Sequence, residues 1–173
     1  KFDTDYYKSV SAIIDWLFEN NTIFNIDLEK ISTVGFSLGG HLAPLAAAHD
    51  NRICCTVGNS GFAQIGGLEG AKQLNPIWQR GVNFMTGYKN FPEAVKHFDL
   101  DITKAPALEC PLLFFHAGRD EVMPTPKKQA DIFMNWAQGE KELKYYPEAE
   151  HCTVDRLDEV FPYIVDWLIT KLR

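Results

Sequence analysis

A serine lies between two glycines in the run Gly35-Phe36-Ser37-Leu38-Gly39, which follows a short apolar segment and precedes the small-residue stretch 42–48. Where a strand turns sharply into a helix at a serine, the turn lifts the serine oxygen out of the sheet. Such a turn needs small residues two positions before and after the serine, because strand and helix pass closely there. Gly35 and Gly39 meet that need. The pattern predicts that Ser37 is a nucleophile presented on a strand-to-helix elbow.

An acid and a histidine follow the serine in the order that this elbow architecture uses. Asp120 comes in a turn just after the apolar run 111–116, and His151 comes in a loop just after a second run, 143–146. Each gap between the three residues is long enough for a crossover that returns to the same sheet edge. We therefore expect the three side chains to converge.

These residue types have separate tasks in acyl transfer. A neutral imidazole, His151, would take the proton of the Ser37 hydroxyl during attack and return it to the leaving group. The carboxylate of Asp120 would fix the tautomer of that imidazole and stabilise its protonated form. The backbone N–H of Leu38 would donate to the oxyanion that forms. The expected reaction passes through an acyl-serine intermediate or a serine-assisted hydration.

Neighbouring polar residues leave alternatives open. Glu121 could be the acid in place of Asp120, although Asp120 fits the turn position better. Glu150 is interpreted as a solvated loop charge. Three further residues near expected strand ends or the elbow are interpreted as structural or as part of a pocket-edge turn: His41, His116 and Ser60.

Metal chemistry is the less favoured interpretation of the same region. The ligand types His116, Asp120, His151 and Cys152 could form a site, but no pair at helical spacing anchors them. The 4 cysteines match neither a zinc knuckle nor a paired CxxC motif, so reduced thiols are expected. We expect no metal and no cofactor.

Composition excludes several function classes. The chain has 173 residues, 46% of them hydrophobic and 23% charged. This length and composition predict one globular domain. The net charge of −6, with no cluster of lysines and arginines, argues against nucleic acid and anionic membrane surfaces as partners. No apolar run approaches the roughly 20 residues of a membrane span, and residues 1–5 lack a signal-peptide pattern. We expect a cytoplasmic protein.

Periodicity and turn residues predict alternating helices and strands. The expected helices are 6–20, 38–49, 124–137 and a last one beginning near 161–162, and the expected strands are 30–36, 53–57, 111–116 and 143–146. Pro44 should kink the second helix or shift its start. This alternation predicts an α/β fold, with a mainly parallel sheet and helices on both faces.

A long segment, 63–109, separates the second and third expected strands and is predicted to be a helical insertion. Insertions of this kind form lids or pocket walls in many enzymes. The large apolar residues Trp78, Phe84 and Met85 are interpreted mainly as the core of the insertion, with substrate contact as the alternative.

Four segments resemble one branch of the α/β hydrolases, the FrsA-like group, which includes pseudooxynicotine hydrolases and polyketide-shortening hydrolases. They are 35–44, Gly61-Phe62, 116–122 and Glu150-His151-Cys152. The resemblance implies the α/β-hydrolase fold, with Ser37, Asp120 and His151 as a catalytic triad and Leu38 at the oxyanion. We also expect Phe36, Phe62 and Val122 to line a substrate pocket. Ala117 departs from the glycine that many relatives carry, without disturbing the acid.

The resemblance also implies what lies outside the chain. About four strands are predicted here, roughly half of those in a complete α/β hydrolase, and the early loop that supplies a second oxyanion donor is missing. We expect 1–173 to be the C-terminal portion of a single catalytic domain, without its N-terminal strands and cap, and with weak or no turnover by itself. An N-terminal segment or another chain should cover the open sheet edge, and a homodimer is one form that this could take.

Members of the group cleave esters or carbon–carbon bonds flanked by carbonyls, often in aromatic or polyketide substrates. The sequence therefore predicts a serine hydrolase that acts on a small-molecule carbonyl substrate. Two alternatives stay open: a serine peptidase of the prolyl-oligopeptidase kind, and a non-catalytic binding module with a hydrolase fold.

Overall fold

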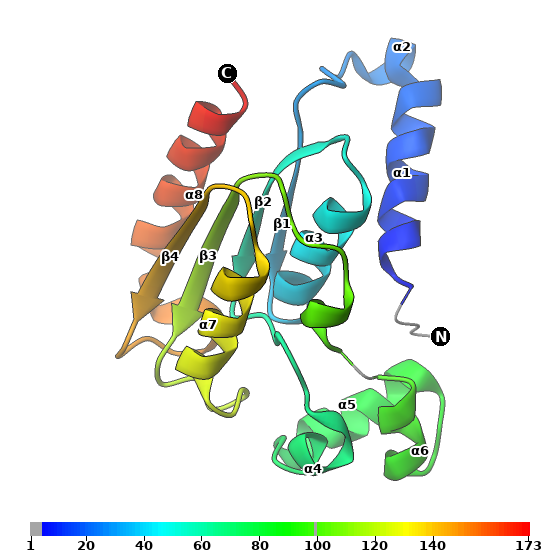
Figure 1. Ribbon diagram of the computed structural model, residues 1–173, viewed down its shortest axis with the longest axis vertical. Coiled ribbons are helices and arrows are strands. Elements are labelled where there is room, and N and C mark those ends of the chain that lie inside the picture. Colours follow the sequence, from blue (N-terminus) through cyan, green and yellow to red (C-terminus); the bar gives the residue numbers. More distant parts are fainter. Residues whose placement is uncertain (1–4, 99) are drawn as a thin grey trace.

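Four short strands build the sheet of this protein, whose computed structural model describes residues 5–98 and 100–173 (Figure 1). The strands are β1 Ile31–Phe36, β2 Ile53–Asn59, β3 Leu112–Ala117 and β4 Lys141–Tyr146. They lie side by side in chain order, and every neighbouring pair is parallel. Their carboxyl ends therefore share one edge of the sheet, where the predicted site residues follow. β1 and β4 form the two outer edges, and the expected cover of the β1 edge stays a prediction.

Helices cover both faces of the sheet, which confirms the predicted fold class (Figure 1). Two helices, α3 Leu38–His49 and α7 Pro126–Trp136, pack on one face, and α8 Leu157–Lys171 packs on the other. The first helix, α1 Tyr7–Glu19, lies outside α3, and the short α2 Asn21–Phe24 follows it. Within the described residues no helix is both long and apolar enough to cross a membrane. Residues 1–4, which entered the signal-peptide argument, lie outside the described residues.

β3, one of the two inner strands, packs against helices on both faces of the sheet. Its side chains alternate between the faces, and all of them are buried. On one face Phe114 stacks on Phe133 of α7, with 4.2 Å between ring centroids. On the other face Phe115 belongs to a cluster with Val160 and Ile164 of α8. β3 is thus fixed from both sides, which gives the turn that follows it a rigid base.

Three helices between β2 and β3 form a separate group beside the carboxyl edge of the sheet (Figure 1). They are α4 Gly67–Ala71, α5 Pro76–Thr86 and α6 Phe91–Lys96, followed by the 3-10 helix η1 Ile102–Lys104. Asn75 and Asn90 cap α5 and α6 by accepting backbone N–H groups. The group has its own apolar cluster, which includes Leu74, Val82 and Val95. This segment falls within the insertion predicted over 63–109.

Two of the aromatic residues assigned to the core of that insertion are not part of it. Phe84 is 89% exposed and Trp78 is 38% exposed, whereas Met85 packs against the cluster. The interpretation as core was wrong for the two aromatics: Phe84 is almost wholly exposed, and Trp78, although it lies on the same stripe of α5 as buried Val82, keeps more than a third of its surface exposed.

The start of the last helix was also predicted wrongly. α8 begins at Leu157, and Pro162 lies inside it rather than in its first turn. Val160, four residues before Ile164, is fully buried on the sheet, so packing extends the helix backwards past the proline. α3, by contrast, begins at Leu38 as predicted and continues through Pro44.

Candidate active site

The serine at the end of β1 lies on a strained turn. Ser37 has φ 55° and ψ −121°, a conformation that L residues rarely adopt. Its backbone N–H donates to the carbonyl oxygen of Asn59, at the end of the neighbouring strand, over 2.9 Å. Behind it, a Cβ built on Gly35 would lie 1.8 Å from the carbonyl oxygen of Gly39, so only glycine fits at position 35. The backbone conformation is that of a nucleophile elbow.

The second glycine of the motif has a different role from the one predicted. No atom outside its own helix and chain neighbours lies within 4 Å of a Cβ built on Gly39. The close approach falls one residue later, where a Cβ on Gly61 would lie 2.3 Å from the carbonyl carbon of Gly40. The helix therefore also passes close to the chain after β2, at Gly40 and Gly61, and the requirement for a small side chain at Gly39 was wrong.

The structure brings Ser37, Asp120 and His151 together at the carboxyl edge of the sheet. Nε2 of His151 lies 2.8 Å from Oγ of Ser37, and Nδ1 lies 2.7 Å from Oδ2 of Asp120. Both distances are those of hydrogen bonds. The imidazole bridges hydroxyl and carboxylate through its two nitrogens, the arrangement that proton transfer from a serine requires.

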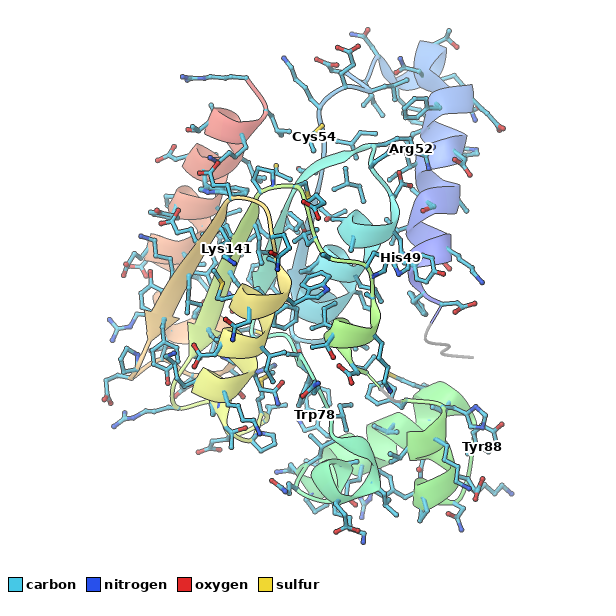
Figure 2. The ribbon with its side chains drawn as sticks, viewed as in Figure 1. His49, Arg52, Cys54, Trp78, Tyr88 and Lys141 are labelled. Atoms are coloured by element: carbon cyan, nitrogen blue, oxygen red, sulfur yellow. The ribbon has the colours of Figure 1, made fainter. Side chains whose placement is uncertain are left out.

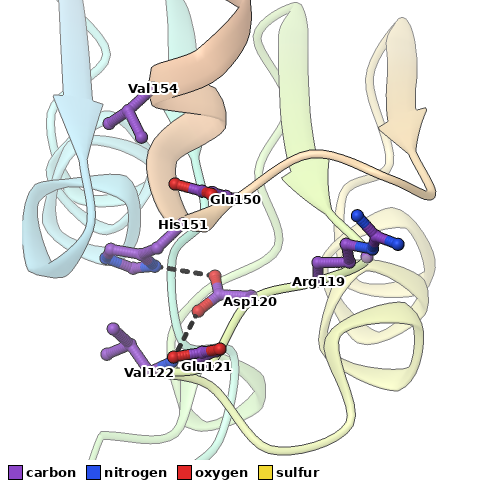
Figure 3. A pocket seen from close by; sticks show the side chains of 8 residues that line it. Arg119, Asp120, Glu121, Val122, Glu150, His151 and Val154 are labelled. Carbon is purple, nitrogen blue, oxygen red and sulfur yellow. Dashed lines mark hydrogen bonds and ion pairs between the residues drawn. The ribbon is translucent and has the colours of Figure 1, made fainter.

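The carboxylate of Asp120 is held by its own turn. Its other oxygen, Oδ1, accepts the backbone N–H of Val122 over 2.9 Å (Figure 3) and that of Met123 over 3.0 Å. The side chain of Asp120 is fully buried. Glu121, the alternative acid, is exposed, as is Glu150. In this geometry Asp120 is the acid that contacts the imidazole.

The surroundings of His151 control its protonation. Burial disfavours the charged imidazole, but the hydrogen bond to Asp120 and the neighbouring Cys152 favour it more, so the pKa of His151 is raised from 6.5 to about 9. These partners therefore stabilise the protonated imidazole relative to a free one. His151 can accept a proton from Ser37 only after it has lost its own.

The predicted oxyanion donor is the backbone N–H of Leu38. Leu38 is the first residue of α3, so its N–H precedes the i→i−4 hydrogen bonds of the helix and is free to point at a ligand. It directly follows Ser37, the position from which an elbow supplies an oxyanion donor.

With this geometry in view, comparisons with known proteins place the chain in a family. The BD-FAE family matches residues 5–136. The chain belongs to the BD-FAE family. No curated protein sequence matches it.

Solved structures confirm the fold of this BD-FAE chain. A 2,6-dihydroxy-pseudo-oxynicotine hydrolase is 24% identical with a TM-score of 0.86, and the match covers 98% of this chain and 47% of that one. Acetyl xylan esterase 1 from Thermoanaerobacterium sp. JW/SL YS485 is 18% identical with a TM-score of 0.58 over 86% of this chain and 47% of that one. The esterase Pf2001 of Pyrococcus furiosus is 19% identical with a TM-score of 0.63 over 99% and 65%. The neighbours are hydrolases and esterases, and the chain has the α/β-hydrolase fold that its sequence predicted. It spans about half the length of the first two.

A cavity of about 780 Å³ opens beside Asp120 and His151 of the BD-FAE chain, and Ser37 is not among the residues that line it (Figure 3). Asp120, Val122 and His151 line it. Of the three predicted pocket residues, only Val122 lies here. Phe36 packs against Phe161 of α8, with 5.8 Å between ring centroids, and Phe62 is buried in the cluster of the insertion.

The two other buried histidines are neutral residues of the core. Burial lowers the pKa of His41 and of His116 to about 4. Nδ1 of His41 lies 2.6 Å from the carbonyl oxygen of Phe62, and Nδ1 of His116 lies 3.4 Å from that of Ala117. Nε2 of His116 has no partner among the described residues. Neither ring contacts Ser37.

Two contacts of the BD-FAE site escaped the sequence analysis. Trp78 of α5 lies edge-on to His151, with 6.5 Å between ring centroids, so the insertion reaches this imidazole. Figure 2 shows Trp78 on the side of the insertion that faces the sheet. Asn59, the last residue of β2, and Ser60, the residue after it, bond to the loop that carries His151. A polar pair directly after a buried strand was the available signal for the second contact. For Trp78 no local signal exists, because its neighbour is distant in sequence.

Proposed function

We propose that this chain carries the catalytic triad of a serine hydrolase that cleaves carboxylic esters through an acyl-enzyme. The observation that carries the proposal is the unbroken hydrogen-bonded path from Oγ of Ser37 through both nitrogens of His151 to Asp120. No single requirement of the fold explains why a strained serine, an imidazole bound on both sides and a buried carboxylate occur together. Together they serve nucleophilic attack on a carbonyl.

The reaction follows from these positions. Oγ of Ser37 attacks the ester carbonyl carbon while neutral His151 takes the hydroxyl proton, and the Leu38 N–H donates to the new oxyanion. The tetrahedral intermediate collapses when His151 returns that proton to the leaving alkoxide, which departs as the alcohol. Water then attacks the acyl-serine by the same route and releases the carboxylic acid and Ser37.

A second candidate reaction is cleavage of a carbon–carbon bond flanked by carbonyls. It is supported by the TM-score of 0.86 to a 2,6-dihydroxy-pseudo-oxynicotine hydrolase, a kind of enzyme found in the group that the sequence resembles. Here the leaving group is a carbanion stabilised as an enolate, and the proton held by His151 would pass to carbon. The triad is the same, so the substrate decides between the two reactions.

Covalent labelling tests the proposal. A fluorophosphonate probe should attach to Ser37 of the full-length protein that contains this chain, the form used in every assay below, and Ser37→Ala should abolish labelling. Ser9→Ala, at an exposed position on α1, should leave labelling intact. Labelling that persists in Ser37→Ala would place the nucleophile elsewhere and overturn the proposal.

A substrate panel separates the candidate reactions. Hydrolysis of an aryl ester but not of a matched β-diketone supports the esterase, and the reverse supports carbon–carbon cleavage. Cleavage of a peptide amide in preference to both would favour the peptidase alternative. A hydrogen-bonded triad with no reactivity toward any of these and no labelling would favour a binding module.

A further inference from the structure

We propose that Asn59 is a positioning residue that holds the nucleophile and the general base in register. Its backbone binds the elbow of Ser37, and its side chain binds the loop that carries His151. The inference rests on the proposed function and extends it to a residue outside the triad.

Asn59 lies where the two parts of the site meet. It is the last residue of β2, and in the sheet it pairs with Phe36 on one side and Phe115 on the other. Its carbonyl oxygen accepts the Ser37 N–H over 2.9 Å. Its side chain is fully buried, so no substrate can reach it.

The side-chain amide of Asn59 binds the backbone and side chain that follow His151. Nδ2 donates to Oγ1 of Thr153 over 2.9 Å and to the carbonyl oxygen of Cys152 over 3.2 Å. Oγ1 of Thr153 in turn donates to the same Cys152 carbonyl over 2.7 Å. A carbonyl can only accept, so the Asn59 amide must present its NH₂ group to the loop. The orientation of the amide is therefore fixed by its partners.

The opposite amide oxygen is left without a hydrogen bond. Oδ1 of Asn59 is buried and has no partner among the described residues. A buried, unpaired acceptor destabilises the folded state. Half of the hydrogen-bonding capacity of this side chain is thus unused, and the half that is used binds the loop that carries His151.

Ser60 also binds the backbone of Cys152. Its Oγ accepts the backbone N–H of Cys152 over 3.0 Å, and its own N–H donates to the carbonyl oxygen of Phe115. Cys152 is thus bound at its N–H by Ser60 and at its carbonyl by Asn59. This residue and Thr153 have φ of 59° and 50°, a conformation that needs such outside support.

The consequence concerns the distance between hydroxyl and imidazole. His151 immediately precedes the two strained residues, so release of Cys152 and Thr153 lets the loop relax and lengthens the contact with Ser37. A misplacement of about 1 Å can reduce the rate about 10²-fold. Since Asn59 does not touch the cavity, the loss should fall on kcat and leave KM nearly unchanged.

Two substitutions at Asn59 test this in the intact protein. Asn59→Ala removes both donated hydrogen bonds and keeps the backbone bond to Ser37. Asn59→Asp keeps the shape but turns an acceptor toward the Cys152 carbonyl. Gln129→Ala is the matched control, because it removes a buried amide whose hydrogen bonds go to Ala63 and Gln64 rather than to the loop that carries His151.

We expect kcat for an aryl ester to fall about 10²-fold in both Asn59 variants with KM changed little, and to stay near the wild-type value in Gln129→Ala. Hydrogen exchange of the 151–154 amides should accelerate in the Asn59 variants alone. Equal kcat and equal exchange in Asn59→Ala and Gln129→Ala, measured where both are folded, would overturn the proposal. If Asn59→Ala fails to fold, Ser60→Ala, which removes only the bond to Cys152, carries the same test.

The two proposals fail separately. If wild-type protein is not labelled at Ser37, the hydrolase is wrong, while accelerated exchange at 151–154 still supports the hold on the loop. If wild-type protein is labelled and the Asn59 variants keep full kcat and protection, the positioning role is wrong and the hydrolase stands.

Discussion

A Cβ on Gly35 would overlap the carbonyl oxygen of Gly39, four residues later, at 1.8 Å, whereas the space around a Cβ on Gly39 itself is open. The two glycines that frame the serine are thus not equivalent. The first lets the strand and the helix cross. The second lies in α3, where the helix would accept a side chain.

The difference in space at Gly35 and Gly39 predicts opposite changes in stability when each is replaced by alanine. Gly35→Ala should lower the free energy of unfolding by at least about 1–3 kcal/mol, because backbone must move to admit the methyl group. Gly39→Ala should raise it by about 0.5–1 kcal/mol, because alanine favours the helix. Urea denaturation midpoints measure both. Equal losses in the two variants would contradict the geometry.

The acid of the site can be tested against its neighbour. Asp120→Asn should lower kcat about 10⁴-fold, because an amide no longer holds the tautomer of His151 that accepts the serine proton. Glu121→Gln should cost far less, since that side chain is exposed and does not contact the imidazole. Steady-state kinetics on an aryl ester compare the two variants. A larger loss for Glu121→Gln would transfer the role of the acid.

The pKa of His151 predicts how activity depends on pH. Since that pKa is about 9 and the base must be neutral, kcat/KM should rise with pH, reach half its maximum near pH 9 and level off above it. A pH profile of ester hydrolysis checks this. An acidic limb with its midpoint near 6.5 would show that the imidazole is not stabilised in its protonated form.

Stability should change in the opposite direction over the same range. The folded-state pKa of His151 is raised above the unfolded value of 6.5, so its contribution to the free energy of unfolding is fully present below pH 6.5 and is lost as the pH rises through about 9. Denaturation curves at several pH values measure this slope. In His151→Gln, the part of the slope that comes from this residue should disappear.

The ring of Trp78 should contribute to the site through His151. An edge-on aromatic contact is worth about 0.5–1.5 kcal/mol, so Trp78→Ala should reduce kcat/KM by about two- to tenfold, and Trp78→Phe by less. Phe84→Ala is the control on the same helix, because Phe84 is 89% exposed and makes no such contact. Equal effects at the two positions would mean that α5 acts only as a whole.

Local sequence signals predicted the framework of the site well. The bounds of α3 match those expected from the small-residue stretch, and the four strands were each placed within a few residues. Glycine and serine at the elbow, and polar residues directly after buried strands, reflect backbone requirements that operate over a few residues. Such requirements can be seen in sequence without knowledge of the tertiary structure.

Long-range packing accounts for what was missed. The start of α8 depends on burial of Val160 against the sheet, which outweighs the usual preference of Pro162 for a first turn. The tie between Asn59 and Thr153 joins residues far apart in the chain, and so does the contact of Trp78 with His151. None of these has a periodic pattern, because each depends on how separate elements meet.

The helices between β2 and β3 have an apolar cluster of their own, yet α5 delivers one ring to the imidazole. The insertion that contacts His151 and the three residues Ser37, Asp120 and His151 therefore lie in separate stretches of the sequence. Exchange of this one contiguous stretch for that of a relative could alter which molecules are accepted while the chemistry stays intact.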